Sequence, residues 1–155
     1  MLCHHAMKLM NLLKNTIFKN GVINLLKGGI LNPQIAHTLS SLAHMDTLVI
    51  SDAGLPVPKG VQRIDLAWKE GEPKYLDVLS EILKHIVVEK AILANELKSV
   101  SPKMHEDIVH LLDDIPIEYV EHANLKQQTE KAKSIIRTGE FTPYPSIILV
   151  SGCAY

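Results

Sequence analysis

Histidine and carboxylate side chains stand on both sides of one short β-branched segment, Thr47–Ser51, and such a combination can move protons near neutral pH. His44 and Asp46 precede the segment, and Asp52 follows it directly. Histidine can both give and take a proton at pH 7, and a nearby carboxylate can orient the imidazole. The pattern predicts proton transfer on a polar substrate, with Asp52 orienting His44.

Further polar residues adjoin two other apolar segments. His122 follows the segment that ends near Val120, while Tyr144 and Ser146 precede the last apolar segment. In an open α/β sheet, ligands bind beyond the carboxyl ends of the strands. We therefore expect these residues to be candidates for one polar site.

Each candidate also has a purely structural interpretation. Asp52 before Ala-Gly is a common turn former, and His44 is a favourable residue at the end of a helix. His122 could begin a short helix, and Tyr144 could be an aromatic residue at the edge of the core. Taken singly, the residues leave both interpretations open.

Sequence motifs for other chemistries are missing. The chain contains no GxGxxG, GxxxxGK[ST], GxSxG or CxxC segment, so dinucleotide, triphosphate, serine-hydrolase and thiol chemistry have no support. His37 and His44 share a helix face but would lie about 10 Å apart along its axis, too far for one zinc ion. We therefore predict a site without metal or cofactor.

The elements that must position these residues alternate between helix and strand. Asn32 and Pro33 suit the start of a helix that we expect to reach Ala43, and Thr47–Ser51 follows as a buried strand. The other expected elements are strands at 61–67, 87–94, 117–120, 135–138 and 147–150, and helices beginning at Pro73 and Pro102 and spanning 124–133. Alternation of this kind predicts a single layered α/β domain with a mostly parallel central sheet flanked by helices. The last strand is expected to be antiparallel, because the loop at 139–146 is too short for a helical crossover.

Composition excludes several classes of protein. The chain has 155 residues, 46% of them hydrophobic and 21% charged, with a net charge of −1, which is typical of one globular domain and not of a disordered chain. Residues 46–155 carry 12 Lys and Arg against 17 Asp and Glu, so no basic surface for nucleic acid is expected. No apolar run approaches the ~20 residues that span a bilayer. With only two cysteines, Cys3 and Cys153, the chain lacks a disulfide framework, which favours a cytoplasmic location.

The first residues differ from the rest. Leu9, Met10, Leu13 and Ile17 recur at helical spacing, and lysines flank them. This pattern fits either a targeting or membrane-surface helix or an extension without function, and the second interpretation is favoured. We expect residues 1–24 to form an extension and residues 25–155 to form the functional domain.

Four segments carry a resemblance to a known family. They are GGILNPQIAHTLSSLAHMDTLVISDAGLPVPKGVQRIDLA at 28–67, VEKAILANELK at 88–98, IEYVEHANLKQQT at 117–129 and IIRTGEFTPYPSIILVSG at 135–152. Together they resemble the ribose branch of the RbsD/FucU sugar mutarotase family in order and over about five-sixths of the chain. The DAGLPVP and RTGEFTPY segments are the most specific to that group.

The resemblance implies an isomerase that interconverts β-D-ribopyranose and β-D-ribofuranose without metal or cofactor. It also implies a homo-oligomer, a ring or decamer, in which a neighbouring subunit helps to build each site. The family's G-H-T-D turn corresponds to Ala43–Asp46 here, so His44 is the implied proton donor. The implied substrate-binding residues are Asp52, His122, Tyr144, Pro145 and Ser146, where the last three replace a family Tyr-Ala-Asn triplet.

Two other functions stay open at this point. Serine at position 146 offers one short hydroxyl where asparagine offers an amide donor and acceptor. The protein could therefore be a fucose-type mutarotase that interconverts anomers of another sugar, or a sugar-binding accessory protein without catalysis. Measuring whether the protein accelerates exchange between the ring forms of ribose, and repeating the measurement with fucose, would distinguish these functions.

Overall fold

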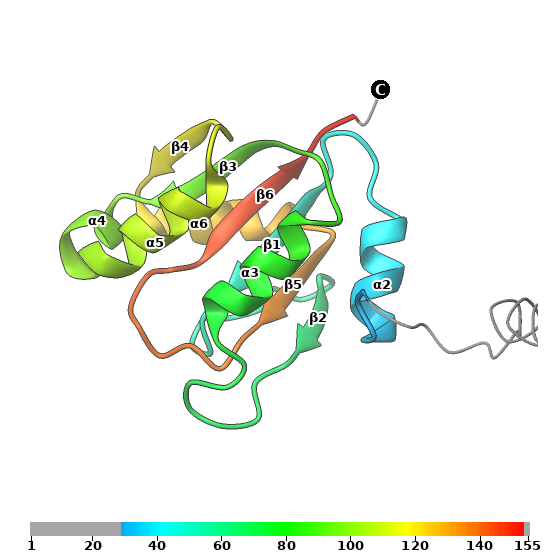
Figure 1. Cartoon of the computed structure of the whole chain (residues 1–155), viewed down its shortest axis with the longest axis horizontal. Helices are drawn as coiled ribbons and strands as arrows, with labels where there is room; N and C mark the ends of the chain where they lie inside the picture. Colours follow the sequence, from blue (N-terminus) through cyan, green and yellow to red (C-terminus); the bar gives the residue numbers. More distant parts are fainter. Residues whose placement is uncertain (1–28, 154–155) are drawn as a thin grey trace, which may run out of the picture. The chain divides into compact units, whose positions relative to one another are not determined.

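The chain folds around a six-stranded sheet with the strand order β2-β5-β1-β6-β3-β4 (Figure 1). A computed structural model describes residues 29–153; the predicted extension at 1–24 and Cys3 lie outside this range. No helix among the described residues is long and apolar enough to cross a membrane. The strands are β1 (Thr47–Ser51), β2 (Gln62–Asp65), β3 (Val88–Ala94), β4 (Ile117–Val120), β5 (Ser134–Arg137) and β6 (Ile147–Ser151). The helices are α2 (Pro33–Ser40), α3 (Tyr75–Leu83), α4 (Glu96–Val100), α5 (Pro102–Leu112), α6 (His122–Gln128) and the 3-10 turn η1 (Thr129–Lys131).

Strand direction confirms the predicted α/β class. Strands β1 and β2 both pair with β5 in parallel, and β3 pairs with β4 in parallel. Strand β6 is antiparallel to both of its neighbours, β1 and β3, as the short preceding loop predicts. The carboxyl ends of β1 to β5 therefore share one edge of the sheet with the amino end of β6.

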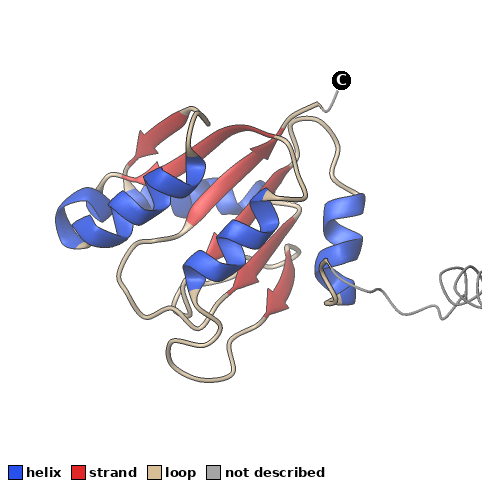
Figure 2. Cartoon of the chain, in the orientation of Figure 1, coloured by secondary structure: helices blue, strands red, loops and turns tan. Residues whose placement is uncertain are grey.

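Helices cover both faces of this sheet (Figure 2). Residues alternate in direction along a strand, so Leu48 and Ile50 face one side and Val49 the other, and all three are fully buried. On the Val49 side, Leu125 of α6 packs with Val49 and Ile148 in one apolar cluster. Burial on both faces explains why β1 is a continuous apolar run.

Helix α2 begins as predicted but ends earlier. The Asn32 side chain accepts hydrogen bonds from the backbone N–H groups of Gln34 and Ile35, at 2.9 and 3.1 Å. The prediction that the helix reaches Ala43 is wrong, because it ends at Ser40. Serine hydroxyls there bond back to helix carbonyls, as Ser41 does to Thr38 at 3.0 Å, and this competes with further helical turns.

Two other elements differ from the prediction. Helix α4 follows β3 directly and is not indicated by the sequence pattern. Helix α6 begins at His122 rather than at 124, and its last turn tightens into η1. Both differences lie beyond the carboxyl ends of strands, where tertiary contacts rather than apolar spacing set the helix boundaries.

A glycine joins the loop after β5 to the start of α3. The Gly139 N–H donates to the carbonyl of Pro73 at 3.1 Å, and the Gly139 carbonyl accepts from Gly71 at 2.7 Å. A Cβ atom at position 139 would lie 2.3 Å from the backbone oxygen of Glu72. Only glycine fits this close approach between two backbone segments.

Gly139→Ala should therefore lower the free energy of unfolding by about 2–3 kcal/mol, the upper part of the usual range for overpacking. The clash is with backbone atoms, which cannot rotate away as a side chain can. Urea unfolding followed by circular dichroism measures the change.

Gly60→Ala is the matched control. Position 60 has φ +89°, but an added Cβ atom would meet no other atom within 4 Å, so the cost there is backbone strain alone, about 1–2 kcal/mol. A loss at position 139 that is smaller than the loss at position 60 would contradict the close-approach argument.

Candidate active site

A pocket of about 400 Å³ opens at the edge of the sheet where the parallel strands end, within the usual size range of small-molecule sites. It lies between the loop after β1, the start of α6 and the loop between β5 and β6. Its polar lining side chains are Asp52, His122, Lys126, Glu140, Thr142 and Tyr144. The expectation that the candidate residues lie together at this edge is met for Asp52, His122 and Tyr144.

Asp52 is held by two hydrogen bonds. One carboxylate oxygen accepts from the backbone N–H of Gly54 at 2.7 Å, which forms the turn that the Asp-Ala-Gly sequence favours. The other oxygen accepts from the hydroxyl of Ser146 at 3.0 Å. Asp52 therefore has both the structural role and a place in the pocket wall, with lone pairs left for a ligand.

Glu140 supplies a second carboxylate that the sequence patterns above do not single out. One of its oxygens accepts from the N–H and hydroxyl of Thr142, at 2.9 and 2.7 Å, and from the N–H of Phe141 at 3.1 Å. Burial acts to raise the pKa of this carboxyl, but the hydrogen bonds from Thr142, Phe141 and the backbone of Tyr75 hold the pKa below its ordinary value. Glu140 thus stays ionised and fixes the fold of its loop.

His122 begins α6 and contacts Tyr144 in the pocket wall. Its backbone N–H donates to the Glu96 carboxylate at 3.0 Å, and its ring meets the Tyr144 ring edge-on with 4.9 Å between centroids. Burial, and then the charge of Lys126, lower the pKa of the imidazole below its ordinary value. Its Nδ1 atom is buried and has no hydrogen-bond partner among the described residues. His122 is therefore a neutral imidazole at pH 7.

The three residues before β6 divide between two roles. Tyr144 lines the pocket in a left-handed backbone conformation with φ 68°, which is rare for a residue other than glycine. Pro145 and Ser146 are buried and do not line the pocket. Within one chain, Ser146 contacts Asp52 instead of open space, so the structure gives it a positioning role behind the pocket wall.

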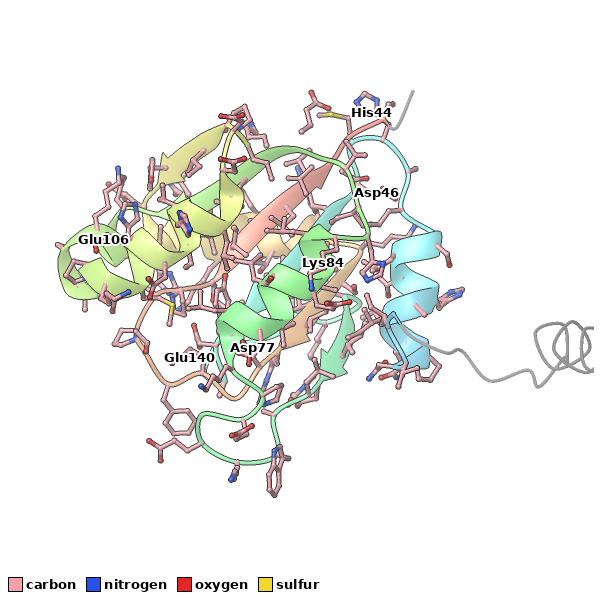
Figure 3. All side chains as sticks on the ribbon, viewed as in Figure 1. His44, Asp46, Asp77, Lys84, Glu106 and Glu140 are labelled. Carbon is pink, nitrogen blue, oxygen red and sulfur yellow. The ribbon has the colours of Figure 1, made fainter. Side chains whose placement is uncertain are left out.

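His44 lies at the opposite end of the sheet from the pocket residue Glu140 (Figure 3). The neighbouring Met45 N–H bonds to Ser151 at the end of β6, whereas Asp52 meets Ser146 just before the start of β6. The five residues of β1 separate the two ends by about 17 Å. The expectation that Asp52 orients His44 therefore fails within one chain, because residues before and after a strand lie at opposite sheet edges.

A different carboxylate contacts His44. Its Nε2 atom lies 2.9 Å from Glu89 Oε2, and both side chains are about half exposed. Glu89 belongs to β3, in the segment where the pairing of β3 with β6 shifts register. No sequence pattern indicates this pair, because 45 residues separate its members.

Lys126 and Phe141 also line the pocket, although no sequence prediction names them. Glu140 and Phe141 lie in the RTGEFTPY segment and follow a strand end, so the edge rule that selects Asp52 could have selected them. Lys126 lies one helical turn after His122, a spacing that places both on one face of α6. Among residues 29–153, no group of three His, Cys, Asp or Glu side chains is arranged to hold a metal ion.

The neutral state of His122 predicts a pH dependence. Its titration, followed by NMR of the ring protons, should have a midpoint below the ordinary value of about 6.5. A depressed histidine pKa means that the unfolded chain binds the proton more readily. The free energy of unfolding therefore has its full value above pH 6.5 and decreases as the pH falls through that value.

His122→Gln identifies the His122 resonance by its absence and also serves as the stability control. The free energy of unfolding of this variant should fall less between pH 7.5 and 5.5 than that of the unsubstituted chain. A midpoint at or above 6.5 would show that the ring is more hydrated than this geometry allows.

Known proteins resemble this chain over most of its length. Residues 25–154 match the family model described as the RbsD / FucU transport protein family. The D-ribose pyranase of Geobacillus thermodenitrificans is 48% identical over 126 residues, covering 81% of this chain and 96% of the relative. The D-ribose pyranase of Latilactobacillus sakei is 44% identical, covering 83% of this chain and 98% of the relative.

Solved structures show the same fold. Bacillus subtilis RbsD, solved in complex with D-ribose, superposes with a TM-score of 0.82 at 43% identity and covers 84% of this chain and all of that one. The fucose mutarotase of Streptococcus pneumoniae, solved with L-fucose, has a TM-score of 0.72 at 23% identity, which is a likeness of fold alone. By sequence and by fold, this chain belongs to the RbsD / FucU family.

Proposed function

We propose that this protein is a D-ribose pyranase, an isomerase that interconverts β-D-ribopyranose and β-D-ribofuranose. One observation carries the proposal: the pocket that holds Asp52, His122 and Tyr144 lies in a chain 43–48% identical to D-ribose pyranases over most of its length. Its carboxylates, neutral imidazole and phenol offer hydrogen-bond acceptors and donors to a small polyhydroxylated molecule.

Ring conversion needs two proton movements for opening and two for closure. The ring oxygen gains a proton as its bond to the anomeric carbon breaks, and the anomeric hydroxyl loses one, which leaves an open-chain aldehyde. The 4-hydroxyl then attacks the aldehyde carbon and gives up its proton, while the aldehyde oxygen gains a proton and becomes the anomeric hydroxyl of the five-membered ring. A general acid beside the ring oxygen and an acceptor beside the anomeric hydroxyl each accelerate the opening step, typically 10²–10⁴-fold.

We assign the acid to His44 and the acceptor to His122. A neutral His122 keeps a lone pair for the departing hydroxyl proton, since its lowered pKa leaves it unprotonated at pH 7. Asp52, fixed by Gly54 and Ser146, accepts a sugar hydroxyl and holds the ring in place. Glu89, rather than Asp52, orients the His44 imidazole through its contact at 2.9 Å.

His44 must reach the pocket of another copy, because strand β1, about 17 Å long, lies between it and Asp52 within one chain. Exposed apolar side chains occur at both ends of the sheet, with Met45 beside His44 and Phe141 in the pocket wall exposed by 60% and 63%. Contact between two different surfaces is heterologous, and repeated contacts of that kind form a ring when the rotation between neighbours closes. We therefore infer a ring-shaped homo-oligomer whose sites are each built by two subunits.

We also infer that the enzyme works in the cytoplasm. The chain has only two cysteines, and Cys153 is exposed, which suits a reducing compartment. Recovery of the native protein in the secreted or periplasmic fraction of its cells would overturn this inference.

Saturation-exchange NMR on D-ribose tests the activity directly. The protein should accelerate exchange between the β-pyranose and β-furanose anomeric protons, and His44→Ala should lower the catalysed rate by about 10²–10⁴-fold while the fold is kept. Binding of ribose without acceleration would instead favour a sugar-binding accessory protein.

Two controls sharpen this experiment. Glu89→Gln keeps a hydrogen-bonding group of the same size, so its rate should lie between those of the unsubstituted chain and His44→Ala. A rate equal to the unsubstituted one would remove Glu89 from the site. L-fucose is the second sugar, and acceleration of fucose anomer exchange alone would favour a fucose-type mutarotase.

Mixing two inactive variants tests the shared site. His44→Ala and Asp52→Asn should each be inactive alone, but chains unfolded and refolded together should regain about one quarter of full activity, since that share of sites receives both intact residues. Mixtures that stay inactive, although both variants assemble, would mean that each site is built by one chain.

A further inference from the structure

The hydroxyl group of Tyr75 is a buried polar group outside the lining of the pocket. Tyr75 is the first residue of α3 and is 0% exposed. Its hydroxyl oxygen makes no hydrogen bond within the described part of the chain. Buried polar groups are nearly always paired, so such an orphan indicates a partner that arrives only in another state of the protein.

The start of α3 is joined to the pocket through a short series of contacts. Gly139 bonds to the carbonyl of Pro73 at 3.1 Å, and the Glu140 carbonyl accepts from the N–H of Ala53, the residue after Asp52, at 2.9 Å. The backbone of Tyr75 also helps to lower the pKa of the Glu140 carboxyl. Figure 3 shows Glu140 at the same end of the sheet as Asp77, which belongs to the first turn of α3. The start of α3 therefore lies close to the part of the pocket that carries the two carboxylates.

Electrostatics keep this phenol protonated. Burial, then the negative charge of Asp52 and then that of Glu140, raise the pKa of Tyr75 well above its ordinary value. The hydroxyl is thus a hydrogen-bond donor within the electrostatic influence of two carboxylates that line the pocket.

Of the two carboxylates, Asp52 accepts fewer hydrogen bonds, two against three. One oxygen of Glu140 already accepts three hydrogen bonds from its own loop. Each oxygen of Asp52 accepts one, and a carboxylate can accept about four in total. One of the Asp52 bonds comes from the Ser146 hydroxyl, which can rotate, so the carboxylate can exchange that partner without a change in the backbone.

We propose that Tyr75 is a positioning residue for Asp52. The buried Tyr75 hydroxyl donates to the Asp52 carboxylate once a sugar hydroxyl binds to that carboxylate from the pocket side. This inference rests on the proposed function, because it takes D-ribose as the occupant of the pocket. Tyr75 touches no sugar atom in this scheme, since its hydroxyl is sealed from the pocket. It holds the loaded carboxylate in one orientation.

Tyr75→Phe removes one oxygen atom and keeps the ring, and two opposite effects are expected. Without sugar, the variant should be as stable as the unsubstituted chain or more stable, because no hydrogen bond is lost. With sugar, the dissociation constant for D-ribose should rise by about three- to tenfold, the usual effect of one lost hydrogen bond. Thermal unfolding with and without ribose, and calorimetric titration, measure the two effects.

Tyr119→Phe is the matched control. The Tyr119 hydroxyl is already paired with the His105 ring at 2.8 Å and does not line the pocket. This variant should lose stability and bind ribose with unchanged affinity. The same substitution is thus expected to weaken ribose binding without loss of stability at position 75, and to lower stability without weaker binding at position 119.

NMR of the full chain with ¹³Cζ-labelled tyrosine reports the bond itself. The Tyr75 resonance, assigned from its absence in Tyr75→Phe, should shift when D-ribose saturates the protein. An unshifted resonance together with unchanged ribose affinity in Tyr75→Phe would overturn the proposal. If Tyr75→Phe does not fold, assignment by elimination with phenylalanine variants of the other tyrosines keeps the NMR test available. A chain that neither binds nor isomerises ribose would contradict the proposed function instead.

Discussion

The hydrogen bond from Ser146 to Asp52, 3.0 Å long, joins the residue before β6 to the residue after β1, and the arrangement of the site depends on it. It can form only because β6 is antiparallel to β1, so that the start of one strand lies beside the end of the other. The same reversal places the end of β6 at Ser151 beside Met45, next to His44. One strand direction therefore sorts the polar residues into two groups at opposite edges of the sheet.

The pocket keeps several groups in states that folding alone would not favour. The hydroxyl of Tyr75 and the Nδ1 atom of His122 are buried without partners in the described part of the chain. Tyr144 holds a left-handed backbone conformation without being glycine. Such features persist where surrounding packing fixes them, and they are concentrated at functional sites. Here two features hold the surrounding segments in place: the close contact of Gly139 with the backbone of Glu72, and the hydrogen bonds that Glu140 accepts from its own loop.

Local sequence patterns predicted most of the fold. Asn32 as a helix cap, Thr47–Ser51 as a buried strand and the antiparallel last strand are confirmed, because each depends on neighbours in the sequence or on loop length. The same rules placed Asp52 and His122 at the edge where the parallel strands end, and there both line one pocket. Patterns of this range could not find contacts such as Glu89 with His44, or the buried phenol of Tyr75, because tertiary packing creates them. Within one chain His44 does not contact Asp52, because residues before and after a strand lie at its opposite ends.

The separation of His44 from the pocket bears on how activity depends on protein concentration. If one chain supplies the acid and another the pocket, no dissociated chain has a complete site, whatever its fold. Activity per chain then depends on mass action, and it falls when the total concentration drops below the dissociation constant of the contact between chains. In a cell with few copies of the chain, total activity would fall more steeply than the copy number. Catalysis would therefore need a minimum level of expression.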